Sequence, residues 1–228
     1  TVTDADIKAM KLGNFSAETM HATNADIKAI TNADSFGGKN VTIGIADTGL
    51  FLNQVEGTTE RSEAEASTTY GSHLNAAAFK DLASGEYSYT DAMVQAAGLS
   101  HQYAHINNKI FYAYDYADTD SNVNPAKDGV SDAAVADNLH GTHVASLAAA
   151  NGDDFKGIAP NAQLAIFKVF GDNSSGASTT AVIAALNDAA KLKIDIINLS
   201  LGQDLYDNSD SADDATYLAT KACQDAGV

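Results

Sequence analysis

The sequence has 228 residues, of which 13 are Lys or Arg and 30 are Asp or Glu, so its formal net charge is −17 at pH 7. A chain this acidic, with Arg61 as its single arginine, would be repelled by phosphate backbones, which argues against a nucleic-acid partner. Its one cysteine, Cys223, excludes an internal disulfide, and without an 18-residue apolar run no transmembrane helix is predicted.

Residues 1–36 are expected to form an N-terminal helical segment. Two near-copies in it, at 3–10 and 23–30, each place a helix-capping residue before a short helical pattern. The first residues lack the charged and apolar regions of a signal peptide, so we expect any targeting segment to have been removed. A β-branched run over 41–46 then predicts a buried strand, and the following Asp47-Thr48-Gly49 predicts a tight turn.

Residues 53–108 have the composition of an insertion, because they are polar and rich in Ala, Ser and Glu. Short helices are predicted in it over 75–82 and 91–97. After the insertion, predicted strands alternate with long predicted helices. The strands cover 109–114, 163–170 and 194–199, and the helices cover 139–150, 178–192 and 212–226.

This alternation predicts a single α/β domain of three layers, with a mostly parallel sheet covered by helices on both faces. Ligands of such sheets bind beyond the carboxyl ends of the strands. The first candidates for a site are therefore Asp47, the loop after Phe170 and the loop after Leu199.

His140 is the strongest candidate for acid–base chemistry. Asn138 is expected to cap the helix, which places His140 in the first turn, where the helix dipole favours a neutral ring that can accept a proton. Asp47, at a strand end, is placed to hold the other ring nitrogen. The small residues of 145–150 allow this helix to lie close to the sheet.

Four motifs together resemble the subtilisin-like serine peptidases, and they occur in the order of that family. They read VTIGIADTGL at 41–50, HGTHVASLAA at 140–149, IAP at 158–160 and IINLSLG at 196–202. The long separation of Asp47 from His140, and KIFYAYDYAD at 109–118, resemble the large cell-envelope peptidases of the lactocepin and C5a-peptidase type. The resemblance implies a subtilisin-like fold and a triad in the order Asp, His, Ser.

Matched position by position, the resemblance makes Asp47 the orienting carboxylate and His140 the general base. It also implies two segments that hold the substrate backbone as an extended strand, which permits broad side-chain specificity. The substrate-binding residues so implied are Ser174, Ser175, Gly176, Ser200, Leu201 and Gly202.

The nucleophilic serine of the resemblance has no counterpart, because no Gly-Thr-Ser occurs in the sequence. We expect the chain to end before the serine and the oxyanion asparagine, to be inactive alone, and to need the remaining C-terminal part of the catalytic domain as its partner. The expected substrate is a peptide or protein, the expected location is secreted or at the cell surface, and the insertion 53–108 is expected to border the cleft. The alternative is a noncatalytic surface binding module that kept the fold.

Other peptidase and metal patterns fit less well. Asp47-Thr48-Gly49 also occurs in aspartic peptidases, but those need a second such turn. His140 and His143 have the wrong spacing for a zincin helix, so His143 is expected to be a buried structural residue. Ser146 stands where the family usually has glycine, at a helix position where a hydroxyl can bond back to a carbonyl, so a slight shift of the local packing is expected.

An acidic cluster precedes the His140 helix, and it does not match an EF-hand, because neither the required glycine nor the twelfth-position glutamate is present. A solvated loop is expected there, with an irregular calcium site as the alternative. The cluster consists of Asp115, Asp118, Asp120, Asn122, Asn124 and Asp128. The calcium loop that many relatives insert after the helix is not expected at 151–156. The sequence therefore assigns no residue to a metal, and calcium is the one cofactor left open.

Overall fold

The computed structural model describes residues 37–51, 78–125, 139–153, 155–172, 174, 176–202 and 214–228. The predicted N-terminal helical segment 1–36 lies outside the described residues, as do most of the first half of the insertion, Asn138, Asp128 and Ser175. Among the helices that are described, none has the length and apolar character needed to cross a membrane.

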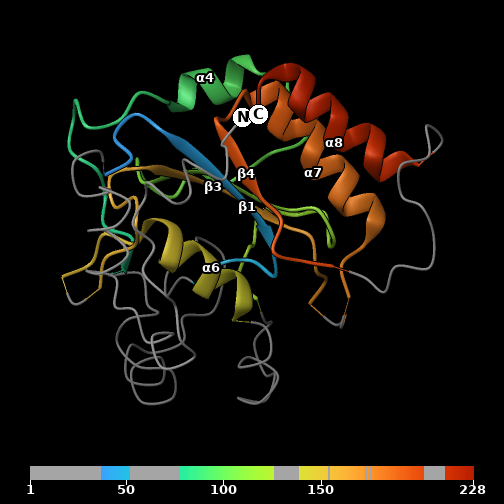
Figure 1. Ribbon diagram of the computed structural model, residues 1–228, viewed down its shortest axis with the longest axis horizontal. Helices are drawn as coiled ribbons and strands as arrows, with labels where there is room; N and C mark the ends of the chain where they lie inside the picture. Colours follow the sequence, from blue (N-terminus) through green and yellow to red (C-terminus); the bar gives the residue numbers. More distant parts are fainter. Residues whose placement is uncertain are drawn as a thin grey trace, which may run out of the picture.

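A four-stranded parallel sheet forms the centre of the molecule (Figure 1). Its strands are β1 (Thr42–Asp47), β2 (Ile110–Asp115), β3 (Gln163–Lys168) and β4 (Ile196–Asn198), in the spatial order β2-β3-β1-β4. All three pairings are parallel, which confirms the sheet expected from the alternation of strands and helices. Each strand lies within two residues of its predicted bounds.

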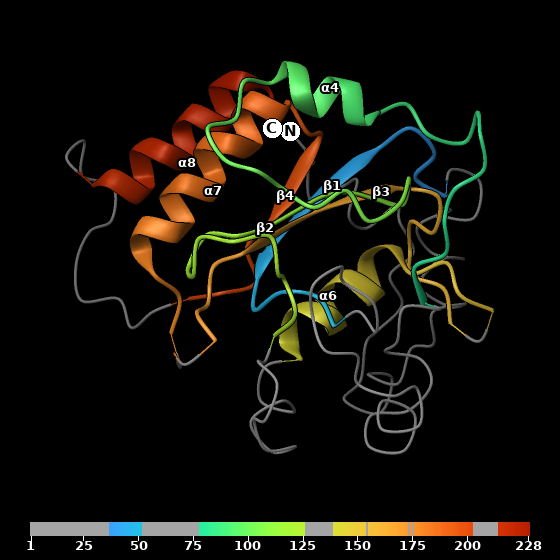
Figure 2. The ribbon, with the colours of Figure 1, turned by 180° about the vertical axis from the view of Figure 1, so that it is seen from behind.

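Helices cover both faces of this sheet (Figures 1 and 2). Helix α6 (His140–Ala149) lies on one face, and α7 (Thr179–Leu192) lies on the other with α8 (Ala215–Ala226) packed beside it. The short helix α4 (Asp91–Ala96) lies on the same side as α7. The three-layer α/β fold is therefore confirmed.

The predicted helix over 75–82 is wrong in its described part, because residues 78–82 form no α-helix. Tertiary contacts take the backbone groups that a helix would have used. The carbonyl of Ala78 accepts from the N–H of Asn151, and the side-chain amide of Asn151 both accepts from and donates to the backbone of Lys80. Ala78 and Phe79 are buried as part of the core.

Two hydrophobic clusters hold the layers together, and the alternation of side chains along β3 separates them. Leu164 and Ile166 join the cluster under α6, whereas Ala165 and Phe167 join the cluster under α7. Because successive side chains of a strand point to opposite faces, both faces of the sheet are apolar and both require a helix cover. Cys223 of α8 is buried in the α7 cluster.

The register of the sheet brings three charged residues into one row. Lys168 at the end of β3 pairs with Asp47 at the end of β1 and with Asp115 at the end of β2. All three are buried. The carboxyl edge of the sheet is therefore where charge gathers, as expected for the ligand-binding edge of a parallel sheet.

Candidate active site

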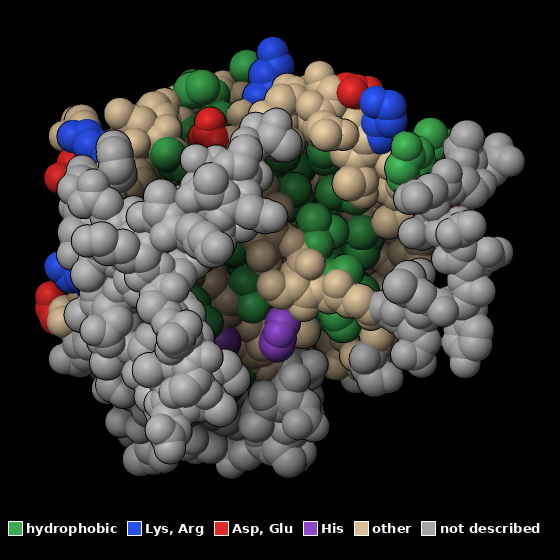
Figure 3. All heavy atoms as spheres, in the orientation of Figure 1, with side chains coloured by type: hydrophobic (Ala, Val, Ile, Leu, Met, Phe, Trp, Pro, Cys, Tyr) green, Lys and Arg blue, Asp and Glu red, His purple; other side chains and the backbone are tan. Residues whose placement is uncertain are grey.

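His140 and Asp47 form a hydrogen-bonded pair at this edge. The Nδ1 atom of His140 lies 2.8 Å from Oδ1 of Asp47 and 3.0 Å from Oδ2. The Asp47 side chain is 2% exposed, whereas the His140 side chain is 54% exposed. A buried carboxylate thus orients one side of an imidazole ring that is otherwise open to solvent. On the face shown in Figure 3, histidine side chains reach the surface next to a hollow lined by hydrophobic side chains.

Two glycines allow the start of α6 to approach the turn after β1. A Cβ atom on Gly141 would lie 2.5 Å from the carbonyl oxygen of Gly49 and 3.0 Å from Cβ of Asp47. Gly49 itself has a φ of +109° and lies against the backbone of Val123, so a side chain is excluded there too. The close approach of His140 to Asp47 therefore requires glycine at positions 49 and 141.

Hydroxyl groups join α6 to the Asp47 turn. The N–H of Gly141 donates to Oγ1 of Thr48 at 2.9 Å, and the N–H of Phe51 donates to Oγ1 of Thr142 at 2.9 Å. Leu139, the residue before α6, makes no side-chain cap bond. Thr48 therefore satisfies a free N–H group of the first helical turn, a role that sequence reasoning did not assign.

His143 is exposed, so the prediction that it is a buried structural residue is wrong. The reason is the position of His143 around the axis of the helix. The sheet-facing residues of α6 are Gly141, Thr142, Ala145, Ser146 and Ala149, and a residue three positions after His140 points away from them.

Ser146 does not form the back-bond that its helix position permits. Its side chain lies in the buried face of α6 at 4% exposure, and its Oγ atom has no hydrogen-bond partner in the part of the chain that the structure describes. The backbone around it is tightly packed, since a Cβ on Gly157 would lie 2.6 Å from the Ser146 carbonyl oxygen.

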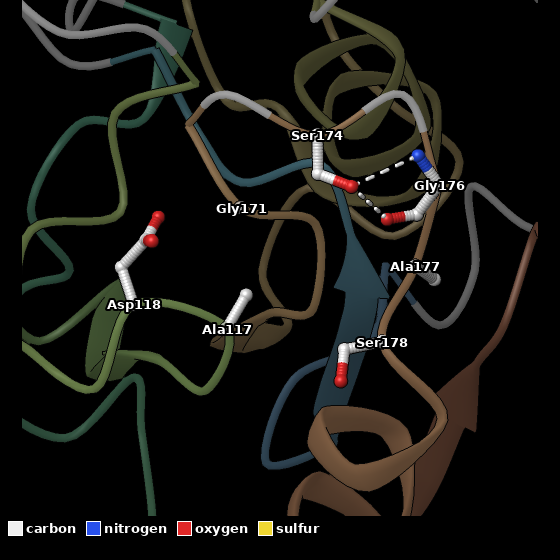
Figure 4. A pocket seen from close by; sticks show the side chains of 7 residues that line it. All are labelled: Ala117, Asp118, Gly171, Ser174, Gly176, Ala177 and Ser178. Atoms are coloured by element: carbon white, nitrogen blue, oxygen red, sulfur yellow. Dashed lines mark hydrogen bonds between the residues drawn. The ribbon is translucent and has the colours of Figure 1, made fainter.

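The two segments implied to bind substrate follow β3 and β4. Ser174 and Gly176 are exposed, and the Ser174 hydroxyl donates to the Gly176 carbonyl at 2.8 Å and accepts from its N–H at 3.2 Å (Figure 4). Ser200 and Gly202 are exposed and Leu201 is half-buried, with the Ser200 hydroxyl donating to the side chain of Asn198. Ser175 lies outside the described residues. Contact of these segments with a substrate stays a prediction.

The acidic cluster after β2 is not simply a solvated loop, because its first member, Asp115, is buried. The Lys168 ammonium binds the Asp115 carboxylate at 2.5 Å and the Asp172 carboxylate at 2.8 Å, and it lies 3.6 Å from Asp118. Burial lowers the pKa of Lys168, but the hydrogen bonds to Asp115 and Asp172 outweigh this effect and raise it above the ordinary value. Sequence reasoning missed Lys168, since only the sheet register brings it to these carboxylates.

The same carboxylates are the candidates for the irregular calcium site considered above. Among the described residues, Asp115, Asp118 and Asp172 form a group whose oxygens lie close enough together to share an ion. The Lys168 ammonium already lies within 4 Å of an oxygen of each. The ammonium therefore already occupies the place between the three carboxylates that a shared ion would take, so these residues do not fit calcium.

Comparison with known proteins shows the family of the chain. Residues 38–227 match the family described as the subtilase family. The chain is 34% identical over 132 residues to the PI-type proteinase of Lactococcus lactis subsp. cremoris, covering 54% of this chain and 6% of that protein.

Two proteins of Bacillus subtilis are also similar. The minor extracellular protease Vpr is 37% identical over 118 residues, covering 52% of this chain and 14% of Vpr. The major intracellular serine protease is 42% identical over 78 residues, covering 33% of this chain and 24% of the protease. The chain thus spans only a small part of each of these relatives, but the family match extends over most of its own length. The chain belongs to the subtilase family.

Proposed function

We propose that this chain is part of a serine endopeptidase that hydrolyses peptide bonds by acyl transfer, with Asp47 and His140 as two members of its triad. The observation that carries the proposal is the hydrogen bond between the buried Asp47 carboxylate and Nδ1 of a largely exposed His140 ring. A surface binding module has no chemical use for such a pair.

The pair supplies both proton transfers of acyl transfer. With Nδ1–H donating to Asp47, the Nε2 atom of His140 is a proton acceptor. It takes the proton of a serine hydroxyl while the serine oxygen attacks the scissile carbonyl carbon. The imidazolium that forms is stabilised by the Asp47 carboxylate and then gives its proton to the leaving amine as the C–N bond breaks. A water molecule repeats the sequence to release the acyl group.

The serine and the oxyanion-hole donor are proposed to come from outside residues 1–228. The sequence contains no Gly-Thr-Ser, and the chain corresponds to 6% of the lactococcal proteinase. Among the described residues β4 is bonded only to β1, and Ile196 on β4 is 53% exposed. An exposed apolar residue at an open sheet edge supports a further strand of the same domain beside β4. Residues 1–228 alone are then inactive.

The substrate is proposed to be a peptide in extended form, lying between Ser174–Gly176 and Ser200–Gly202. Both segments follow the carboxyl ends of strands, and their described residues lie at or near the surface. Main-chain hydrogen bonds to such edges hold the peptide irrespective of most of its side chains. The insertion 53–108 is proposed to border this cleft and to narrow substrate choice.

The protein is proposed to act outside the cell or at the cell surface. The net charge of −17 keeps a protein dispersed in an extracellular medium, and one of the relatives is named as extracellular. Another relative is named as intracellular, so this part of the proposal depends on the charge and on the resemblance to the cell-envelope peptidases.

A fluorophosphonate probe tests the proposed function, because it labels a serine only when a base has activated it. The full-length protein is expected to be labelled, and His140→Ala in the full-length protein is expected to abolish labelling. Residues 1–228 expressed alone are expected to remain unlabelled. His143→Ala is the matched control on the exposed face of α6 and is expected to label normally. If the folded full-length protein is neither labelled nor able to cleave any peptide, the binding module replaces the peptidase.

A further inference from the structure

A cavity of about 360 Å³ lies between the loop after β2 and the loop after β3. Figure 4 shows Asp118 on one side of it and Ser174, Gly176 and Ser178 on the other. Ser174 and Gly176 belong to the segment proposed to pair with the substrate backbone. A peptide held by this segment therefore has the cavity beside it, within reach of one of its side chains.

The wall formed by Asp118 is anionic and held in place. Its Oδ2 atom accepts from the N–H of Asp172 at 2.7 Å, and the side chain is 31% exposed. The nearby Lys168 ammonium is 1% exposed and binds Asp115 and Asp172 at shorter distances than Asp118. Three carboxylates around one ammonium give this end of the cavity a negative formal charge, and the Asp118 carboxylate is the charged group that lines the cavity itself.

The remaining walls are small and neutral. Ala117, Gly171 and Ala177 contribute no charge, and the hydroxyl of Ser178 accepts from the N–H of Ala181 at the start of α7. The cavity is therefore roomy, polar at one end and free of bulky side chains among the described residues. A long flexible side chain with a positive end fits these properties, since its stem lies along the small residues while its charge reaches Asp118.

We propose that Asp118 is a specificity-determining residue, and that the cavity takes a Lys or Arg side chain of the peptide bound along Ser174–Gly176. This inference rests on the proposed peptidase function and deepens it. Backbone pairing gives broad binding, and one carboxylate in a neighbouring cavity adds a preference at a single substrate position. A partly exposed charge pair of this kind raises kcat/KM by roughly two- to fivefold over a neutral side chain.

The experiment compares fluorogenic peptides that differ at one position, with Lys, norleucine or Glu placed in turn at each residue before the cleaved bond. The full-length enzyme is expected to show, at one position, a kcat/KM for the Lys peptide roughly two- to fivefold above that for the norleucine peptide. Asp118→Asn keeps the shape of the side chain and an acceptor for the N–H of Asp172. It is expected to bring the ratio of kcat/KM for the Lys peptide to that for the norleucine peptide close to one. Asp118→Lys is expected to favour Glu at that same position.

Asp120→Asn is the matched control, because Asp120 lies in the same loop, is exposed and does not line the cavity. It is expected to keep the preference of the parent enzyme. If neutral peptides are cleaved but no position favours Lys, or if Asp118→Asn leaves the preference intact, the inference about Asp118 is wrong and the peptidase function stands. If the full-length protein cleaves no peptide at all, both proposals fail.

Discussion

Gly141 is the residue on which the geometry of the pair depends most directly. A glycine-to-alanine change within a helix ordinarily stabilises it by roughly 1 kcal/mol. Here the added methyl group would lie 2.5 Å from the Gly49 carbonyl oxygen, which is backbone and cannot rotate away. The start of α6, and with it His140, would have to move away from Asp47.

Gly141→Ala is therefore expected to destabilise the full-length protein, by about 1 to 3 kcal/mol, as overpacked sites do. It is also expected to lower kcat, since the Nδ1 atom of His140 would lose its 2.8 Å contact with Asp47. Urea unfolding and peptide hydrolysis measure the two effects. A variant as stable and as active as the parent would show that the close approach of Gly141 to the turn is unimportant.

At the residue scale, the sequence predicts what lies in local motifs and misses what depends on register or phase. The hydrogen bond between Asp47 and His140 could be predicted because each residue stands in a recognisable motif. The position of His143 was predicted wrongly, since the burial of one helix residue depends on which face meets the sheet. Lys168 was missed because its ion pair with Asp115 forms only when β2 and β3 align.

At the scale of the elements, α6 is a helix whose small residues let it lie against β1 and β3. Ala145 and Ala149 are fully buried against the sheet. The strands and long helices were predictable because their apolar patterns are strong. The helix expected over 75–82 failed because Ala78 and Lys80 use their backbone groups in contacts with Asn151, more than 70 positions away in the sequence.

Lys109, the residue just before β2, is expected to make the free energy of unfolding depend on pH. Lys109 is fully buried, and its ammonium donates to the backbone carbonyls of Pro160 and Ala162. Burial lowers the pKa of Lys109 to about 7. Above pH 7 the folded state therefore binds fewer protons here than the unfolded state, so this residue makes the free energy of unfolding rise with pH up to the ordinary lysine pKa.

Lys109→Met is expected to remove this rise of the free energy of unfolding with pH. Between pH 7 and 10 the free energy of unfolding of the parent should increase, relative to that of the variant, by on the order of 1 kcal/mol per pH unit. Urea unfolding at several pH values measures the difference. Lys39→Met, at an exposed position, serves as the control and should follow the parent curve. Parallel curves for the parent and Lys109→Met would mean that Lys109 keeps its proton when buried.

At the scale of the whole molecule, the described chain is a parallel sheet with an open edge at β4 and the hydrogen-bonded pair of Asp47 and His140 at its carboxyl end. The fold class followed from periodicity, because strands buried on both faces need helices on both faces. The function could be approached from the sequence only through family motifs. The nucleophile could not be identified, since no serine here stands in the Gly-Thr-Ser turn of the family.

The central claim is that Asp47 acts through His140, and Asp47→Asn in the full-length enzyme tests it most directly. An amide keeps the shape of the carboxylate but favours the wrong ring tautomer and does not stabilise the imidazolium. The account predicts that kcat for a peptide falls by about 10³- to 10⁴-fold in a protein that still folds. Asp153→Asn, at an exposed site, is predicted to change kcat little. A kcat for Asp47→Asn within tenfold of the parent would contradict the account.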